Sequence, residues 1–553
     1  MPVLAYRMIR REVMADGTSQ HPILAPAARY PEMARRVVSA QGSHGRIIRG
    51  LMSTPRSDHF QGRFGRMFGH LPAATYGKTD PDSRAALMKL GSAMTAEFDG
   101  PKDGFDGEES GIPALYTYFG QFVDHDITFD PMSSLIKRRD PDSLVDFRTP
   151  TLDLDNVYGR GPDDQPYMYQ PDGKHFLLGD PLNNGAHNLV RNNASPRRAL
   201  IGDPRNDENS IVSQLQGLMH RFHNKVVDQQ GVDFATAQKI VRWHYQWIVV
   251  HDFLPKIIIA KVLDSLKTDD AFDHKKLKYY HWRNDPFMPV EFAVAAYRLG
   301  HSMIRPGYRL NGDDATLLPI FPVPSQNLPD GLTGFQAMAP NRGIDWGRFI
   351  DVGAQRPYGE EPNTQKPATE AMRNRLQFAY RIDTSLVNPL ASLPSSVASD
   401  PPPSLAQRNL LRGFELGLPT GQDVAQQMRE TVLTDKEIVL GKAVDGEPGK
   451  GDVFGTIKDI SGFEKNCPLW TYILAEAMHN KTTLPIHAVG GPAAGVTTPQ
   501  LGPVGGRIVA EVFLGMLFGD STSFLSAAPS WRPTLAAEGN GFTLRDLVNY
   551  ATT

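Results

Sequence analysis

Apolar residues recur at helical spacing along most of this chain, whereas strand-like alternation is scarce. From Asn209 to Gln229, and again from Arg242 to Leu263, apolar positions fall three or four residues apart, which predicts amphipathic helices. Further helices are predicted at 111–130, 290–304, 404–414, 421–431, 467–480 and 506–518. The pattern therefore predicts a mainly α protein with a single large helical core, long irregular loops and little β structure.

The N-terminal fifth of the chain has a different character from the rest. Residues 1–110 are rich in Gly, Arg and Pro and contain only short helical candidates. We expect them to form an arm wrapped on the core, with residues 111–553 making up the main domain. The 50 Gly and 44 Pro residues of the whole chain are consistent with long connections between the ordered elements.

The charge and the cysteine content of the chain argue against several classes of function. The 58 basic and 61 acidic residues give a net charge of -3, which argues against nucleic acid as an obligatory partner. No run approaches the ~18 apolar residues of a transmembrane helix. No signal peptide is visible either, so we expect a cytoplasmic protein or one exported by a leaderless route. The single Cys467 excludes a disulfide framework and a cysteine-built zinc or iron–sulfur site. Nothing in the sequence specifies an oligomeric state.

Polar groups interrupt the otherwise apolar run from Phe119 to Asp126. If Leu115 to Ile127 is a helix, Gln121, Asp124 and His125 share one face, and Asp126 is turned about 100° away. Burying such a face is costly unless its polar groups are satisfied, which indicates a ligand, a metal or a cofactor. The alternative is a core histidine that is hydrogen-bonded to its neighbours.

A polar turn at 202–208 precedes the helix predicted from Asn209. Arg205 and Glu208 lie three residues apart in it and could converge on one ligand, although an ordinary acidic turn at a helix start is the alternative. His220 and His223 follow on the helix at a spacing that suits a metal. No carboxylate joins them at a zinc-enzyme spacing, so we expect packing or surface roles for both.

Two more segments carry candidate chemistry. His301 lies on a predicted apolar helix among small residues that would let a flat ligand approach, and its neutral imidazole suits haem iron, while Arg298 one turn earlier could meet a haem propionate. Oxygen-bearing side chains occupy alternate positions in a second segment and could wrap one hard cation, as calcium loops do. These residues are Thr149, Thr151, Asp153 and Asp155.

Together these four segments resemble the animal-type haem peroxidases, the superfamily that includes the mammalian defence peroxidases and the cyclooxygenases. The resemblance extends from Gly62 to Ala551 and includes the stretches Asn409 to Gly413 and Leu501 to Ile508. The absence of disulfides favours a bacterial member. The resemblance makes residues 111–553 a haem peroxidase catalytic domain.

The resemblance also implies a role for each candidate on the distal side of the haem. His125 matches the distal acid/base, Gln121 lies beside it, and Arg205 matches the distal arginine. Asp124 and Glu208 fall at the two positions from which the family esterifies its haem.

The proximal side and the calcium site are implied in the same way. His301 matches the proximal ligand of the haem iron, and Asn409 matches the residue that accepts the other N–H of that ring. Arg298 and Arg412 fall at propionate or proximal-side positions. The calcium site is matched by Asp126 and the 149–155 loop, namely Thr149, Thr151 through its carbonyl, Asp153 and Asp155.

The implied cofactors are haem b, ester-linked if the two carboxylates react, and Ca²⁺. The implied reaction uses hydrogen peroxide to oxidise a halide, thiocyanate or phenolic donor through a ferryl intermediate. A fatty-acid dioxygenase of the same superfamily is one alternative, but its tyrosine lies three residues before the proximal histidine, where this chain has Arg298, and Tyr297 is one residue further away. A non-catalytic haem and calcium adhesion module is the other alternative.

Overall fold

The computed structural model describes residues 64–96, 106–128, 148–283, 285–313, 317–322, 331–353, 374–394, 397–398, 400–442, 453–486, 494–536, 539 and 541–553. Much of the predicted arm, residues 1–63 and 97–105, lies outside the described residues. The described part is mainly helical, and its strands pair only into two-stranded sheets. The predicted fold class is therefore confirmed.

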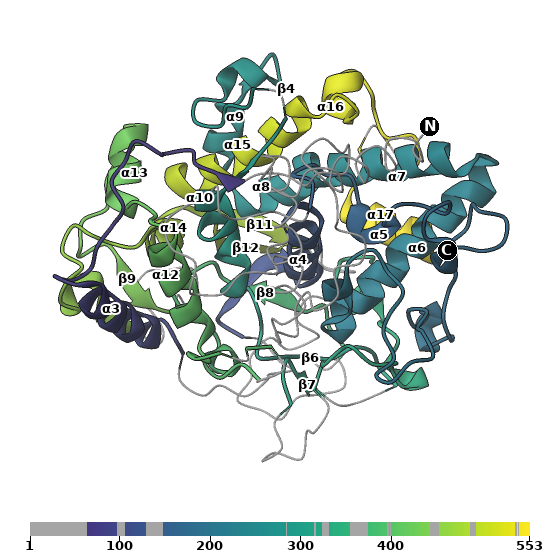
Figure 1. Cartoon of the computed structure of the whole chain (residues 1–553), viewed down its shortest axis with the longest axis horizontal. Coiled ribbons are helices and arrows are strands. Elements are labelled where there is room, and N and C mark those ends of the chain that lie inside the picture. Colours follow the sequence, from purple (N-terminus) through teal and green to yellow (C-terminus); the bar gives the residue numbers. More distant parts are fainter. Residues whose placement is uncertain are drawn as a thin grey trace, which may run out of the picture.

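One apolar helix lies in the middle of the molecule. Figure 1 shows α4 (Leu115–Ile127) between α6 (Ser210–Gln230) and α7 (Phe234–Ile248) on one side and α12 (Leu405–Glu415) on the other. Nearly all of α4 is buried because it is apolar around most of its circumference. A helix of this kind needs neighbours on most sides, and His125 and Asp126 are therefore enclosed by protein.

The carboxyl-terminal half supplies a second group of packed helices. These are α13 (Gly421–Met428), α14 (Leu469–His479), α15 (Pro503–Gly519) and α12. Their bounds agree within a few residues with the helices predicted at 404–414, 421–431, 467–480 and 506–518. Cys467 is fully buried just before α14, as expected for a small hydrophobic residue. The shorter helices are α5 (Asp155–Tyr158), α8 (Leu254–Ile257), α9 (Ala260–Asp264), α10 (Val290–Ala293), α16 (Phe524–Ala527) and α17 (Leu544–Thr552).

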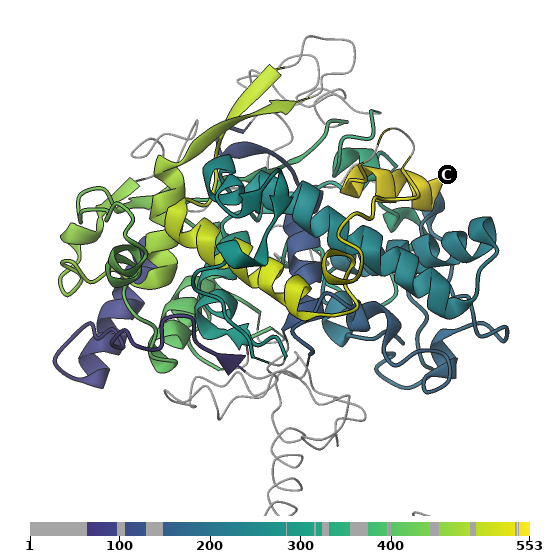
Figure 2. The same cartoon turned by 90° about the horizontal axis from the view of Figure 1, so that it is seen from above.

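The strands are short, and several of them, such as β2 (Glu109–Pro113) and β8 (Phe378–Tyr380), are buried. The longest pair, antiparallel β11 (Lys481–Ile486) and β12 (Ala494–Pro499), forms a ribbon at the edge of the molecule in Figure 2. The remaining strands are β1 (Phe64–Gly65), β3 (Lys267–Thr268), β4 (Ala271–Phe272), β5 (Met288–Pro289), β6 (Gly307–Tyr308), β7 (Leu318–Pro319), β9 (Val439–Gly441) and β10 (Val453–Thr456).

Two predicted helices are interrupted in the structure. The stretch 290–304 is not one helix, because α10 ends at Ala293 and a separate 3-10 helix, η7 (Ala296–His301), follows. Ala295 between them has φ -133° and ψ -75°, which no helix permits. The stretch 242–263 is likewise divided by a π-helical segment at Val249–Phe253. The first interruption matters most, because it sets the direction in which His301 leaves the backbone.

The described part of the N-terminal region packs on the carboxyl-terminal helices. Helix α3 (Asp80–Ala93) lies against α12, and a Cβ placed on Gly91 would come within 2.6 Å of the Gln407 side chain. Arg66 donates hydrogen bonds to the carbonyls of Leu416 and Gly417, the latter at 3.2 Å. Residues 64–96 are therefore held against the core by specific contacts.

Candidate functional site

Helix α4 carries the distal candidates, and its geometry separates them as the spacing predicts. Gln121 and His125 turn toward the 202–208 loop, and Gln121 Nε2 donates to Glu208 Oε1. His125 Nε2 lies 3.9 Å from the same Glu208 oxygen. Asp126 faces the other way, fully buried, and accepts a hydrogen bond of 3.0 Å from the Tyr245 hydroxyl. The structure thus brings Gln121, His125 and Glu208 into one cluster.

Asp124 occupies the edge of this cluster. Its carboxylate accepts a hydrogen bond of 3.1 Å from the Thr128 hydroxyl one turn further along, and the side chain is partly exposed. Burial raises the pKa of Tyr297, and the negative charge of Asp124 adds to that effect. Burial lowers the pKa of Arg298 to about 10, and Asp124 opposes that effect. Asp124 therefore acts electrostatically on η7, the segment that carries His301.

The His125 imidazole is held as a neutral base. Burial lowers the pKa of His125, and the positive charge of Arg205 lowers it further, while Glu208 opposes both effects. Its Nδ1 lies 2.7 Å from Asn206 Oδ1. A neutral ring with one nitrogen committed to a carbonyl oxygen can accept a proton at the other nitrogen.

Arg205 is anchored by protein acceptors. Its Nη2 donates to the carbonyls of His125 at 3.0 Å and Thr128 at 2.6 Å, and to Asp203 at 2.8 Å. These contacts tie the carboxyl end of α4 to the 3-10 turn η4 (Pro204–Asp207). In this arrangement Arg205 fixes the distal helix and acts on His125 through its charge.

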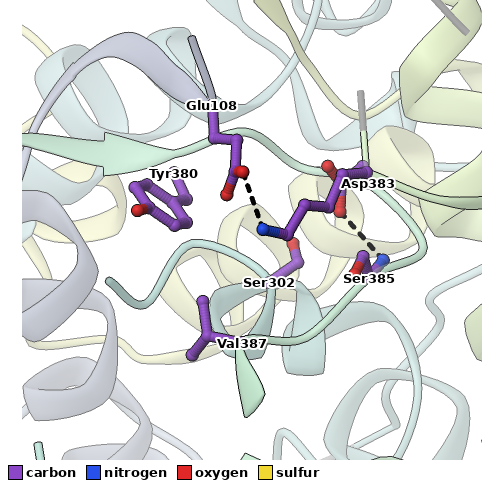
Figure 3. Close-up of a pocket in the computed structure, with 7 residues that line it drawn as sticks. Glu108, Ser302, Tyr380, Asp383, Ser385 and Val387 are labelled. Atoms are coloured by element: carbon purple, nitrogen blue, oxygen red, sulfur yellow. Dashed lines mark hydrogen bonds and ion pairs between the residues drawn. The ribbon is translucent and has the colours of Figure 1, made fainter. Parts of the chain in front are cut away.

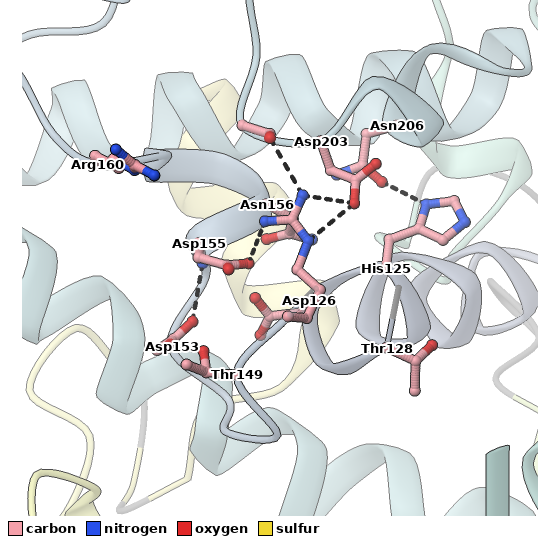
Figure 4. A network of polar contacts seen from close by, with 12 residues as sticks. His125, Asp126, Thr128, Thr149, Asp153, Asp155, Asn156, Arg160, Asp203 and Asn206 are labelled. Atoms are coloured by element: carbon pink, nitrogen blue, oxygen red, sulfur yellow. Dashed lines mark hydrogen bonds and ion pairs between the residues drawn. The ribbon is translucent and has the colours of Figure 1, made fainter. Parts of the chain in front are cut away.

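An acidic cluster lies on the far side of α4, as Figure 4 shows for Asp126, Asp153 and Asp155. Oxygens of these three carboxylates lie within 4.8 Å of one another. Thr149 and Thr151 donate their hydroxyls to Asp153 at 2.6 and 2.8 Å, so the whole predicted loop converges on one place. Burial, and then the charges of Asp153 and Asp155, raise the pKa of Asp126 well above its ordinary value. Mutual repulsion of this kind is what a bound cation relieves.

Arg148 is a member of this region that sequence reasoning missed. Its guanidinium lies 2.7 Å from Asp155 Oδ1 and 2.7 Å from Asp203 Oδ2, and so joins the acidic cluster to the distal loop. The two loops also touch through backbone, since a Cβ on Gly202 would lie 2.3 Å from the carbonyl oxygen of Asp155. Only glycine permits that approach. Through Arg148, Asp203 and Arg205, the acidic cluster is therefore connected to the end of the helix that carries His125.

His301 lies at the end of η7. Burial lowers the pKa of His301 to about 3, and the positive charge of Arg298 contributes to that effect. Glu208 raises the pKa of His301 and also that of His125, so one carboxylate lies within electrostatic reach of both imidazoles. Apart from its chain neighbours and the backbone of η7, a Cβ added to Gly300 would meet none of the described atoms within 4 Å.

Asn409 contacts His301, but not in the predicted sense. Arg298 Nη1 donates to Asn409 Oδ1 at 2.7 Å, so the amide nitrogen of Asn409 faces His301 Nδ1 at 2.8 Å. Because an amide nitrogen only donates, Asn409 does not accept the ring N–H as expected. Arg298 has taken the acceptor oxygen. Arg412 is buried nearby, and its charge lowers the pKa of Arg298.

A small polar cavity lies next to η7 and is lined by Ser302, the residue after His301. Figure 3 shows Glu108, Tyr380, Asp383 and Ser385 around it, and Lys442 pairs with Glu108 at 2.7 Å. None of the predicted site residues lines this cavity.

Several site residues carried no signal strong enough to find them in the sequence. Asp203 is fully buried, and although burial raises its pKa, Arg205 and Arg148 hold that pKa far below the ordinary value. Asn206 contacts His125, although the sequence pattern indicated only Arg205 and Glu208, which lie on either side of it. His220 is buried as expected, yet it belongs to a hydrogen-bonded chain that leads to His125. An Asp-Pro-Arg turn before a helix was the available clue to Asp203.

Comparisons with known proteins agree with this picture at the level of fold. A family profile described as animal haem peroxidase matches residues 135–328, less than half of the chain, which include Arg205, Glu208 and His301. No curated protein matches. Peroxidase A from Dictyostelium discoideum has a similar structure, with a TM-score of 0.54 and 14% identity over 89% of this chain and 93% of that one. The fold is thus that of the helical haem peroxidase core.

Fatty acid alpha-dioxygenase from Oryza sativa gives a weaker match. With palmitic acid bound it has a TM-score of 0.48 and 14% identity over 89% of this chain and 79% of that one. No described helix is long and apolar enough to cross a membrane.

Proposed function

We propose that this chain is a haem peroxidase of the animal type, which uses hydrogen peroxide to oxidise a small anionic or phenolic donor. The observation that carries the proposal is a pair of histidines on separate elements, the buried His125 on α4 and the partly buried His301 on η7. Glu208 lies 3.9 Å from His125 Nε2, Asn409 lies 2.8 Å from His301 Nδ1, and burial lowers the pKa of both rings so that they are neutral. The family profile and the shared fold support the same assignment.

The residues around His301 fit a haem. A neutral imidazole is the form that binds iron, and the low pKa of His301 keeps it neutral at any physiological pH. Gly300 carries no side chain that would obstruct a flat ring next to His301. Arg298 and Arg412 bring two positive charges that suit the carboxylates of a porphyrin.

Bound haem would supply the iron that takes up peroxide and stores its oxidising equivalents. The chain's own part is proton transfer. His125 Nε2 faces Gln121 and Glu208, where it accepts a proton from peroxide and returns it to the departing oxygen. The charge of Arg205 favours the accompanying build-up of negative charge. Gln121 orients the Glu208 carboxylate beside His125 by donating a hydrogen bond to it.

Asn409 supports a second part of the proposal. If Arg298 were to hold a haem carboxylate, the amide oxygen of Asn409 would become available to accept the Nδ1–H of His301. That hydrogen bond would leave Nε2 of His301 unprotonated for iron. Cofactor binding and preparation of its ligand are then linked by Arg298.

The acidic cluster fits Ca²⁺. Asp126 Oδ1 is buried and has no hydrogen-bond partner among the described residues, which is costly unless a cation approaches it. We propose that Asp126, Asp153 and Asp155 hold calcium, with oxygen atoms of Thr149 and Thr151 as further ligands. Because Asp126 adjoins His125, the ion would stabilise the carboxyl end of the distal helix.

Asp124 and Glu208 belong to different elements and both lie close to His125, which supports the proposal that both become esterified to haem methyl groups. Glu208 lies beside His125, and Asp124 interacts with η7. Such bonds would form oxidatively when peroxide is present.

Steady-state oxidation tests the assignment. Haem-loaded protein should oxidise a phenolic dye with peroxide, and the same preparation given bromide, iodide or thiocyanate identifies the preferred donor. Oxygen uptake with a fatty acid and no dye oxidation would favour the dioxygenase. Haem binding without either reaction would favour the adhesion module.

A further inference from the structure

A chain of buried polar side chains leads away from the distal histidine. His125 Nδ1 lies 2.7 Å from Asn206 Oδ1, and Asn206 Nδ2 donates to Gln216 Oε1 at 2.8 Å. Gln216 Nε2 then lies 2.9 Å from His220 Nε2. Asn206 and Gln216 are 0% exposed, and the two histidines 5% each. Burying four such groups is costly unless each is paired.

The direction of this chain decides which nitrogen of His125 carries hydrogen. An amide oxygen accepts only, so with Asn206 Oδ1 facing it, Nδ1 of His125 must be protonated and Nε2 bare. If both amides turned over, Asn206 would donate to Nδ1 and the bare nitrogen would be lost from the Glu208 side. A group outside this series of hydrogen bonds must therefore determine which of the two amide orientations is more stable.

One backbone carbonyl makes that choice. Gln216 Nε2 lies 3.5 Å from the carbonyl oxygen of Asn156, which also accepts the Asp203 N–H at 3.1 Å. A carbonyl cannot donate, so it favours the amide nitrogen of Gln216 on its side and the amide oxygen toward Asn206. His220 at the far end accepts from the same nitrogen. Burial lowers the pKa of His220 to about 3, which keeps it neutral and able to accept.

We propose that Asn206, Gln216 and His220 form a positioning relay that fixes the Nδ1–H tautomer of His125, so that Nε2 is presented as the proton acceptor. The relay gives this role to Asn206 in the loop and to two residues of α6, and the carbonyl of Asn156 sets its direction. The catalytic role of the relay rests on the proposed peroxidase function. The prediction that His125 is protonated at Nδ1 does not depend on that function.

The tautomer is measured directly by NMR on the full chain labelled with ¹⁵N-histidine, with His125→Gln used to assign the signal. We expect His125 to be protonated at Nδ1. Gln216→Leu should lower the ratio of Nδ1–H to Nε2–H by about five-fold, the equivalent of one hydrogen bond of about 1 kcal/mol. Asn206→Leu should do the same, and Asn206→Asp, which retains an accepting oxygen, should restore the ratio.

Gln214→Leu is the matched control. Gln214 is also a buried glutamine of α6, but it bonds to the carbonyl of Arg342 and the N–H of Ile344 instead. Its loss should leave the His125 tautomer unchanged. A second matched pair is His220→Phe against His223→Phe, since His223 bonds to Tyr158 and the Lys174 carbonyl.

Kinetics separate the relay from the proposed function. In haem-loaded protein, Gln216→Leu should slow the reaction with peroxide about five-fold or more, with full haem absorbance retained. A wild type that shows the Nδ1–H tautomer but does not react with peroxide would keep the relay and reject the peroxidase. An Nε2–H tautomer in the wild type, or a ratio unmoved in Asn206→Leu, would overturn the relay.

Discussion

Removal of the cation from the acidic cluster should make the stability of this protein fall as the pH rises. Without a cation, burial raises the pKa of Asp155 to about 7, with Arg148 opposing and Asp153 adding to the effect. The unfolded chain has an aspartate pKa of about 3.9. The folded carboxyl therefore binds its proton more tightly than the unfolded one, and stability is lost as the pH rises between those two values.

The magnitude follows from the same difference. About 3 pKa units correspond to about 4 kcal/mol, and since the Asp155 side chain remains 27% exposed, solvent screening reduces the expected loss to about 2 to 3 kcal/mol. For a chain of this size 1 kcal/mol shifts Tm by about 1 °C. About two thirds of that loss falls above pH 5, so Asp155 should lower the Tm of the calcium-free protein by about 1 to 2 °C between pH 5 and pH 8.

Differential scanning calorimetry with chelator and with Ca²⁺, at pH 5 and pH 8, measures this effect. Calcium should raise Tm at both values and by more at pH 8, where the carboxylates are charged. Asp155→Asn in chelator isolates the contribution of this one group, because it removes the pH-dependent part. The reasoning is refuted if Ca²⁺ raises Tm equally at the two pH values, or if Asp155→Asn keeps the full pH dependence.

Three further predictions concern the haem side. His301→Ala should abolish stable haem binding, and full Soret absorbance in that variant would contradict the axial assignment. After brief peroxide exposure, acidified organic solvent should extract little haem from the wild type and intermediate amounts from Asp124→Val or Glu208→Gln; complete extraction from the wild type would rule out the esters. Asn409→Leu should weaken haem binding by about 10- to 100-fold, as loss of a hydrogen bond to a metal ligand does. Titration with haem checks this, and unchanged affinity would show that Asn409 does not support His301.

The helices that apolar spacing predicts are those with a continuous buried stripe. Helix α6 begins at Ser210, because Asn209 caps it by accepting from the N–H groups of Ile211 and Val212. That signal is local and readable in the sequence. The break between α10 and η7 has no comparable signal, since neither proline nor glycine marks it, and tertiary packing sets it.

The same distinction applies to the site. Helical periodicity was sufficient to place Gln121 and His125 on one face and Asp126 on another. It could not foresee that Arg148 bridges Asp155 and Asp203, because these contacts join segments about 50 residues apart in sequence. Periodicity also could not predict the hydrogen bond from Arg298 to Asn409, which lies 111 residues away in sequence. Long-range polar pairing is decided by the fold and not by local spacing.

The central claim, that His125 is the acid/base opposite an iron held by His301, is tested most directly by stopped-flow mixing of haem-loaded protein with hydrogen peroxide. The account predicts a fast spectral change in the wild type. In His125→Ala the rate should fall by at least about 100-fold, while the haem spectrum of the resting variant stays intact. Equal rates in the wild type and His125→Ala would contradict it.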